Sequence, residues 1–258
     1  MTILELLAAV LIGLFTVAAA MDAYLTLHTQ SVMQDEINEM QQSGRAAMRV
    51  LSEHLRMAGF GLPATLDPLA GVDSNPDTIT VTNLDATGCE ASTSASMASV
   101  SDNLVCSGAD LSCFSPGMRV YVFDAVNGVG EFFTVSTIES APPALTHTAA
   151  LSRTYPSGSR VSRILQMSYY LDRADTLHPM LVRHPVGGAP EPYAENIEDL
   201  QFDYIMQDGD TLATPVTPTL VRNVLVRIMA RTNRVDQIMD QAYRRRQYGF
   251  VVSVRNQE

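Results

Sequence analysis

The chain has 258 residues, of which 46% are hydrophobic, so it can fold around one large core or two small ones and is not expected to be disordered. Its formal net charge is −11, and all of its 17 basic residues are arginine. An acidic chain without lysine is poorly suited to present a broad phosphate-binding surface. We therefore do not expect this chain on its own to bind nucleic acid.

An apolar run extends from Met1 to Ala20, and Glu5 is its only charged residue. About 20 apolar residues are enough to cross the hydrocarbon core of a membrane as a helix. No basic residue precedes the run and no small-residue cleavage site interrupts it, so the pattern differs from that of a secretory signal peptide. It favours a chain whose N-terminus has already been processed.

Glu5 needs a partner, because an ionised carboxylate at membrane depth is unstable unless another group neutralises it. If Met1 carries a free α-amine, the amine of a neighbouring copy could pair with Glu5, since the two groups lie one helical turn apart in depth. Two copies staggered along a common axis would then neutralise both charges inside an apolar bundle. The alternative is a simple signal anchor in which Glu5 lies near the lipid headgroups.

Two motifs in the first quarter of the chain resemble those of a known family. The sequence MTILEL resembles the mature N-terminus of type IV pilins and type II secretion pseudopilins, and Glu5 falls on the glutamate of that family. The patterns QQSGR and RMAG between Met40 and Gly61 are similar to the end of the first helix of PilW-type minor pilins. The resemblance implies cleavage by a prepilin peptidase, N-methylation of Met1, and assembly with itself and other pilin subunits by an inner-membrane machinery.

The second half of the chain adds to this resemblance. The segments YYL, LVR, NIEDLQFDY, VRI and VSVRN follow one another between Tyr169 and Asn256 as they do in PilW-like or J-type pseudopilins. The match is poor between residues 64 and 160, where an insertion contains three cysteines. Within the insertion, the Ser-rich segment from Ala91 to Ser99 is expected to be an exposed, flexible loop.

A single long helix is predicted from residue 2 to about residue 58. Apolar residues recur at three- and four-residue spacing between Met33 and Leu55, with charged residues between them. At about 1.5 Å per residue the helix would be about 85 Å long, and the sequence GFGLP that follows would end it. Its apolar first half needs lipid or other helices, whereas its amphipathic second half can pack on a sheet.

Short alternating runs separated by turn residues predict an antiparallel β domain after residue 63. Asn127–Gly128 and Asp208–Gly209 are the expected hairpin turns. The expected strands are at residues 78–82, 118–123, 131–138, 160–171, 180–183, 197–206, 219–231 and 248–255. The sequence therefore predicts an α+β fold in which a very long N-terminal helix packs on a C-terminal antiparallel sheet, as in pilins.

The expected organisation has four parts. Residues 1–28 are the apolar half of the helix, for the membrane or a filament core, and residues 29–62 contain its amphipathic half. Residues 63–165 form a β-rich insertion with the cysteine loop, and residues 166–258 form a C-terminal antiparallel β module.

Three cysteines, Cys89, Cys106 and Cys113, lie in one stretch rich in Ser, Gly and Asp, and none is in a Cys-x-x-Cys motif. In an exported domain this clustering predicts one disulfide and one remaining thiol. The short loop favours a bond between Cys106 and Cys113, although Cys89 with either partner stays open. A metal site is not expected, because three cysteines would need a fourth ligand and the five histidines are scattered.

The sequence contains little that indicates chemistry. Asp73, Asn75 and Asp77 have the spacing of the first ligands of a calcium loop, but the required Gly and the bidentate Glu are missing, so a turn is expected. The cluster Arg244–Arg246 is interpreted as a solvated strand edge with local carboxylate partners. No phosphate-binding Gly loop or hydrolase motif is present, so we expect no enzymatic activity and no cofactor.

Two classes of function fit these features. The first is a structural subunit of a type IV pilus-like or pseudopilus filament, with Glu5 paired to a neighbouring N-terminal amine; the resemblance favours a minor, priming subunit over a major one. Such a subunit would be anchored in the inner membrane before assembly and lie in a periplasmic or cell-surface filament afterwards. The second class is a monomeric extracytoplasmic β-domain binding module that the helix tethers to the membrane.

Overall fold

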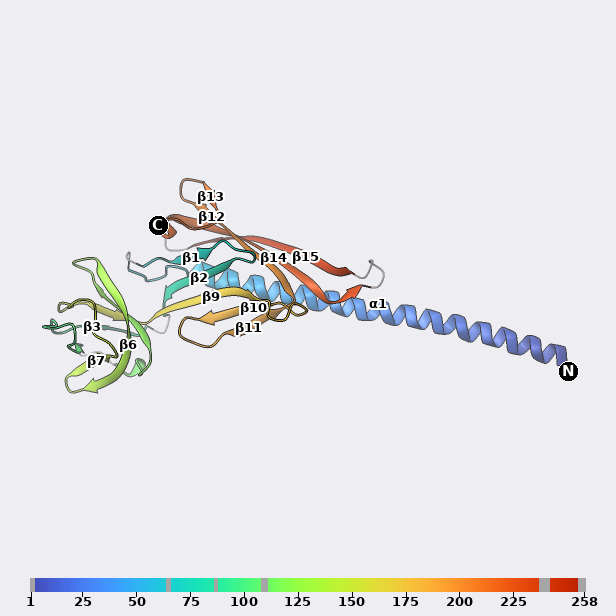
Figure 1. The fold of residues 1–258 in the computed structure, drawn as a ribbon, viewed down its shortest axis with the longest axis horizontal. Coiled ribbons are helices and arrows are strands. Elements are labelled where there is room, and N and C mark those ends of the chain that lie inside the picture. The colour runs from blue at the N-terminus through green and yellow to red at the C-terminus, as the bar shows by residue number, and fades with distance from the viewer. Residues whose placement is uncertain (1–2, 64–65, 86–87, 108–110, 237–241, 255–258) are drawn as a thin grey trace.

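The computed structural model describes residues 3–63, 66–85, 88–107, 111–236 and 242–254. One helix, α1 (Ile3–Met57), contains 55 residues and confirms the predicted long N-terminal helix. At about 1.5 Å per residue it is about 80 Å long, and its first half extends beyond the rest of the molecule (Figure 1). Gly59 and Gly61, both with positive φ, follow its end, as glycines do at helix C-termini.

Two antiparallel sheets pack against one side of the second half of α1, and its other side is exposed. The five-stranded sheet has the order β1 (Leu69–Val72), β2 (Thr78–Leu84), β9 (Ile164–Asp172), β10 (Met180–Pro185), β11 (Glu191–Glu195). The four-stranded sheet has the order β13 (Thr211–Leu212), β12 (Ile197–Met206), β14 (Val221–Asp236), β15 (Ala242–Ser253), and the 3-10 helix η2 (Pro218–Leu220) precedes β14. This arrangement of one long helix with antiparallel sheets confirms the predicted α+β class.

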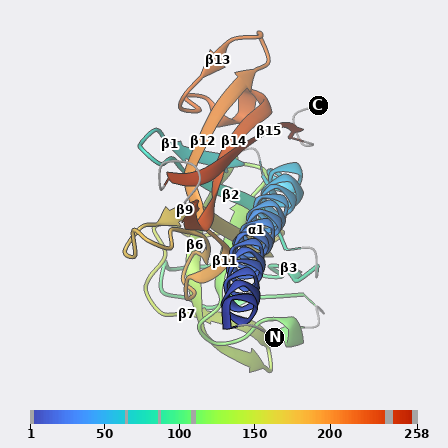
Figure 2. The same ribbon diagram turned by 90° about the vertical axis from the view of Figure 1, so that its right-hand side faces the viewer.

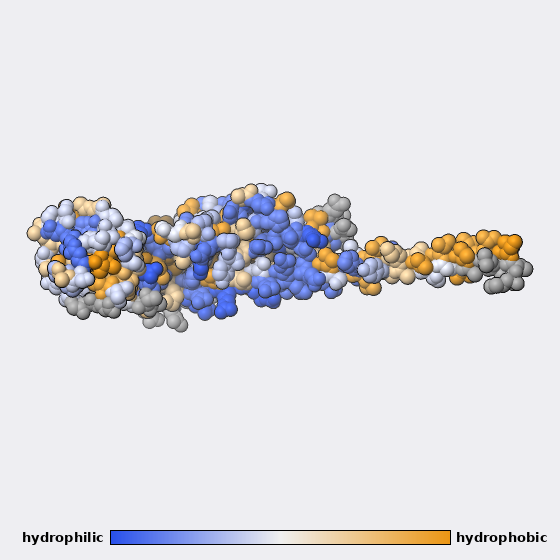
Figure 3. All heavy atoms as spheres, turned by 90° about the horizontal axis from the view of Figure 1, so that it is seen from below, coloured by the Kyte–Doolittle hydropathy of each residue, from blue (hydrophilic) through white to orange (hydrophobic). Residues whose placement is uncertain are grey.

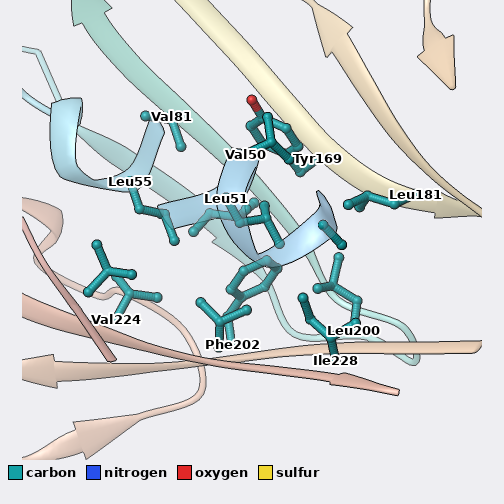
Figure 4. Close-up of a cluster of buried hydrophobic side chains, with 14 of the residues drawn as sticks. Val50, Leu51, Leu55, Val81, Tyr169, Leu181, Leu200, Phe202, Val224 and Ile228 are labelled. Atoms are coloured by element: carbon teal, nitrogen blue, oxygen red, sulfur yellow. The ribbon is translucent and has the colours of Figure 1, made fainter. Parts of the chain in front are cut away.

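The main hydrophobic core lies where α1 meets the two sheets. Leu51 and Leu55 of α1 are fully buried, and Phe202 and Ile228 approach them from β12 and β14 (Figure 4). Tyr169 of β9 closes the core from the five-stranded sheet. Fully burying one such side chain stabilises a fold by about 1.5–3 kcal/mol, so this half of the helix holds the two sheets together.

Gly44 allows α1 and β15 to approach each other closely. The ring of Tyr248 lies directly against the helix at this residue, and a Cβ added to Gly44 would overlap the ring. Gly44 belongs to the QQSGR pattern that the sequence analysis identified. The glycine is therefore explained by packing, because any side chain would push β15 away from the helix.

A second unit forms a small closed barrel at the end of the molecule opposite the N-terminus (Figure 1). Its six strands have the order β3 (Glu90–Ser92), β8 (Arg160–Ser162), β5 (Arg119–Asp124), β6 (Val129–Ser140), β7 (Pro143–His147), β4 (Leu104–Val105). The two edges meet at a bridge between Thr93 and Cys106, where Ser94 N–H donates to Val105 O (2.8 Å) and Ser107 N–H to Ser92 O (2.9 Å). The barrel has its own hydrophobic core, which includes Val120, Val135 and Leu145.

The barrel is inserted between two neighbouring strands, β2 and β9. Leu84 of β2 pairs with Ile164 of β9 at the point where the chain leaves and re-enters the sheet. Beside this pair, Asp85 N–H donates to Arg163 O (2.9 Å), and the Arg163 guanidinium lies 3.1 Å from the Asp85 carboxylate. The inserted unit therefore begins after residue 85 and ends at residue 163, whereas a β-rich insertion over residues 63–165 was expected.

Most of the expected strands and both expected turns are present, with one difference. The run predicted as a single strand at residues 160–171 is divided at Arg163, because β8 belongs to the barrel and β9 to the five-stranded sheet. Gly128 and Gly209 have positive φ in the predicted hairpin turns.

Two expectations about the inserted segment are wrong. The Ser-rich segment 91–99 is not a fully exposed loop, because Ala91, Thr93 and Met97 are buried in the barrel. The disulfide joins Cys89 to Cys113, which lies in the 3-10 helix η1 (Leu111–Cys113), and the favoured pairing of Cys106 with Cys113 is not formed. Loop length favoured the shorter pairing, but strand pairing holds Cys106 at the barrel seam with its thiol buried.

Gly44→Ala tests the close approach of α1 and β15. Overpacking at this contact should lower the free energy of unfolding by about 1–3 kcal/mol. Ala has a higher helix propensity than Gly, which offsets this loss by about 1 kcal/mol at most. Thermal unfolding of the full chain in detergent measures the net loss. Gly13→Ala is the matched control, because a Cβ there has no neighbour within 4 Å and should leave the domain as stable as before.

Excision of the barrel tests whether it is a separate unit. Replacing residues 85–163 with a two-residue Asn-Gly turn would join the paired residues Leu84 and Ile164 as a tight β-hairpin. The shortened chain should keep its circular dichroism signal for α1 and a cooperative thermal transition, because the main core contains no barrel residue. An aggregated or non-cooperative product would mean that the barrel is needed to fold the rest.

Candidate functional site

The first half of α1 presents apolar side chains to its surroundings. The ring of Phe15 is 74% exposed, and Figure 3 shows this part of the helix as a hydrophobic rod attached to a mainly hydrophilic domain. The exposed large side chains are Ile3, Leu7, Val10, Leu11, Ile12, Leu14, Phe15, Val17, Met21, Tyr24, Leu25 and Leu27. Exposed apolar surface of this extent indicates a contact with membrane or protein, and the helix is long and apolar enough to cross a membrane.

The predicted assembly residues lie at the free end of this rod. Glu5 is in α1, two residues after its first residue, Ile3, although its side chain is outside the described part of the structure. Met1, the predicted site of processing and N-methylation, lies outside the described residues. The expected spacing of one helical turn between Met1 and Glu5 therefore stays a prediction.

The apolar rod ends in a group of polar and aromatic residues. Asp22 is followed by Tyr24 and His28, whose exposed rings stack with centroids 6.1 Å apart. Tyrosine is enriched at membrane–water interfaces, where its ring is apolar and its hydroxyl can be hydrated. Between Ile3 and Met21 the rod is about 28 Å long, close to the thickness of a hydrocarbon core of about 30 Å.

Glu36 fixes the place where α1 enters the β domain. Its side chain is buried, and its Oε2 accepts hydrogen bonds from the backbone N–H groups of Asn233 (3.0 Å) and Arg234 (3.2 Å). The Arg234 guanidinium lies 3.4 Å from Glu36 Oε1. These amides are free to bond the helix because β14 has a bulge between Arg231 and Val235. The carboxylate therefore joins the helix to the end of the β14–β15 hairpin.

The polar groups of the β domain are largely used in structural contacts. Asp77, in the suspected calcium loop, accepts hydrogen bonds from the N–H groups of Ser74 (2.9 Å) and Phe202 (2.8 Å), so it ties the turn to β12. Arg244 pairs with Asp236 at 2.5 Å and Arg245 with Glu198 at 2.5 Å. Among the described residues, no group of three or more His, Cys, Asp or Glu side chains could hold a metal ion.

One titratable contact lies at the helix–sheet interface. The Tyr169 hydroxyl hydrogen-bonds Nδ1 of His54, and the two rings meet edge to face. Burial lowers the pKa of His54 below its usual 6.5, the nearby Arg183 guanidinium lowers it further, and Glu53 opposes them. Burial also raises the pKa of Tyr169, so the phenol stays protonated at neutral pH and can donate to Nδ1 of His54 in the tautomer in which that nitrogen carries no proton.

The sequence reasoning missed Glu36, His54 and Tyr169. The two residues of α1 lie in a helix that was expected to pack on a sheet, but the partners come from strands about 115 and 197 residues away. No local pattern identifies such pairs.

Comparisons of the chain with protein-family models, with curated proteins and with solved structures found no match. The architecture of a long apolar N-terminal helix on an antiparallel β domain with one disulfide is compatible with a pilin-like fold.

His54 should make the domain less stable in mild acid. Because its pKa is lower in the folded state than the usual 6.5, the unfolded chain binds more protons, and stability is lost as the pH falls from about 6.5 through the folded pKa. Thermal unfolding at pH 7.5 and pH 5.5 should show a smaller difference for His54→Gln than for the native chain. His184→Gln, on the neighbouring strand β10, is the control; an unchanged difference for His54→Gln would contradict this prediction.

Proposed function

We propose that this chain is a structural subunit of a type IV pilus-like or pseudopilus filament and that it polymerises through α1. The observation that carries the proposal is the division of this helix: its second half builds the core of the β domain, and its first half presents apolar side chains without cover. Such a helix needs an apolar environment outside its own domain, which lipid supplies before assembly and a bundle of like helices supplies afterwards.

The motifs at the N-terminus support the same function. Glu5 occupies the position of the pilin glutamate, and the resemblance assigns it the N-terminal amine of a neighbouring copy as its partner. That resemblance also points to processing by a prepilin peptidase, methylation of Met1, and insertion by an inner-membrane assembly machinery. The likeness to PilW-type and J-type proteins favours a minor subunit that primes the filament.

The role is non-catalytic. Support comes from the contacts of the β domain, where Asp77 and Glu36 are hydrogen-bonded to backbone amides and the paired arginines face carboxylates. These groups hold strands and helix together and leave little for substrate chemistry. The same exposed helix would also serve a monomeric tethered module, so the experiment must separate assembly from anchoring.

Glu5→Ala separates the two roles. In a filament the substitution removes the partner of the neighbouring amine, so sheared filaments should lose the protein while the membrane fraction keeps it. A tethered module should tolerate the change, because an apolar residue suits the membrane better than a carboxylate. Asp22→Ala is the control, since it removes a carboxylate at the water interface and should leave assembly intact.

Electron microscopy of sheared filaments, with mass spectrometry of their protein, provides the readout. Abundant native protein along the shaft would identify a major subunit. Trace amounts, with filaments lost on deletion of the gene, would identify a priming subunit. Membrane-bound protein without filaments in any strain would reject the filament role in favour of the tethered module.

A further inference from the structure

The solvent face of the second half of α1 has two separate rows of charge. Arg45, Arg49 and Arg56 form a basic row, because about 100° of rotation per residue places them within roughly 40° of one another around the helix axis. Asp35 and Glu39 form an acidic row, roughly 80° further around the axis. All five side chains are exposed, as is Glu53, which lies on the acidic side of the helix between Arg49 and Arg56, and the buried face of the helix lies on the opposite side.

These charges form no ion pairs with the described residues of the chain. In the described part of the structure, none of the five side chains takes part in an ion pair, whereas eight arginines elsewhere do. Moreover, Asp35 and Glu39 are four residues apart, as are Arg45 and Arg49. Like charges at this spacing repel each other in an isolated helix. Both rows would therefore gain from a partner of opposite charge.

The spacing of the rows specifies what that partner could be. Asp35 precedes Arg45 by ten residues, and Glu39 precedes Arg49 by ten residues. Ten residues correspond to about 15 Å along a helix. A second, parallel copy of α1 displaced by about 15 Å would bring both of its carboxylates level with both arginines of the first copy.

The position of the helix leaves this face free for such a neighbour. Figure 2 looks along α1 from its N-terminal end and shows the two sheets on one side of it. Two copies could thus bring the exposed faces of their helices together with the sheets on the outside. The contact joins different surfaces of the two copies, and a head-to-tail contact of this kind produces an open filament when the rotation does not close.

We propose that Asp35 and Glu39 of one copy bind Arg45 and Arg49 of a second copy in the filament and set an axial stagger of about 15 Å between them. This proposal rests on the proposed function and adds a subunit interface to it. The occupant is a second copy because the chain's own acidic row has the spacing that matches its basic row. At a net charge of −11, copies repel one another overall, so local pairing of this kind is needed to align them.

Charge reversal tests the pairing. Arg49→Glu and Glu39→Arg should each lower the yield of sedimentable filaments by about tenfold or more, since each places like charges opposite one another in the interface. The double variant Glu39→Arg/Arg49→Glu restores opposite charges and should recover most of the yield. Glu39→Arg turns its repulsive spacing from Asp35 into an attractive one, so weaker folding cannot explain its loss. Arg49→Glu gains attraction to Arg45 but meets Glu53 four residues later, so its loss is judged by the recovery in the double variant.

Arg222→Glu provides the matched control. Arg222 is exposed, lies on β14 away from the helix, and has no ion pair among the described residues, so its reversal should leave the yield unchanged. The single reversals should also assemble worse in low salt than in high salt, because salt screens the repulsion they introduce.

Cysteine crosslinking tests the stagger. The double variant Glu39→Cys/Arg49→Cys should give a ladder of disulfide-linked copies on a non-reducing gel. Asp35→Cys/Arg56→Cys should not, because its positions are 21 residues, or about 32 Å, apart along the helix. The native free thiol at Cys106 is buried and should add no crosslinks.

The outcomes separate this proposal from the function on which it rests. Filaments of native protein that are unaffected by both single reversals would overturn the interface and leave the filament role intact. Native protein that forms no filaments would overturn both. Loss in the single variants without recovery in the double variant would show that the rows do not bind each other.

Discussion

The first half of α1 needs an apolar environment, and its own β domain does not supply one. A water-exposed helix of this composition would be unstable, because burial of apolar surface is the main force that folds and associates proteins. The β domain supplies that burial only beyond Glu36, where the carboxylate binds the end of the β14–β15 hairpin. Stability of the domain and the environment of the free helix are therefore separate problems, joined by one continuous backbone.

In the proposed function, this separation lets the same helix serve first a membrane and then a filament. Lipid tails are about as apolar as leucine side chains, so helices that leave the bilayer for a bundle exchange one apolar environment for another. The gain then comes from packing and from polar pairs such as the one proposed for Glu5. Since α1 is continuous through Glu36, a displacement of the apolar half moves the charged rows on its second half by the same distance.

The sequence was sufficient for features that follow from local pattern. Helix period, alternating strands and turn glycines predicted α1, most of the strands and the α+β class, because each of these is decided by neighbours in the chain. The order of strands at the barrel seam and the disulfide partner of Cys89 were not predictable in this way. They depend on which distant segments meet, and the pairing of Thr93 with Cys106 overrode the preference for a short disulfide loop.

The same distinction between local pattern and contacts of distant segments applies to the candidate functional site on α1. Glu5 was recognisable as a lone charge in an apolar run, and Gly44 as part of a motif, although the reason for the glycine became clear only from Tyr248. Glu36 is one of several acidic residues on the helix, and the helix period places it beside the apolar residues Met33 and Met40, but nothing near it in the sequence indicates its partners on β14. Its depth of burial depends on the rotation of α1 against the sheets, which is set by the packing of Leu51 and Leu55.

The barrel lies far from the apolar half of α1 (Figure 1). It enters and leaves the sheet at one adjacent pair, Leu84 and Ile164, so its insertion leaves the strand order of the helix-bound sheets unchanged. It also lies at the end of the molecule opposite the N-terminus (Figure 1). A surface placed there can change without altering the helix contacts, because the barrel has its own core and disulfide. In a filament held together by α1, the barrel is thus the part of the subunit that is free to acquire a separate role.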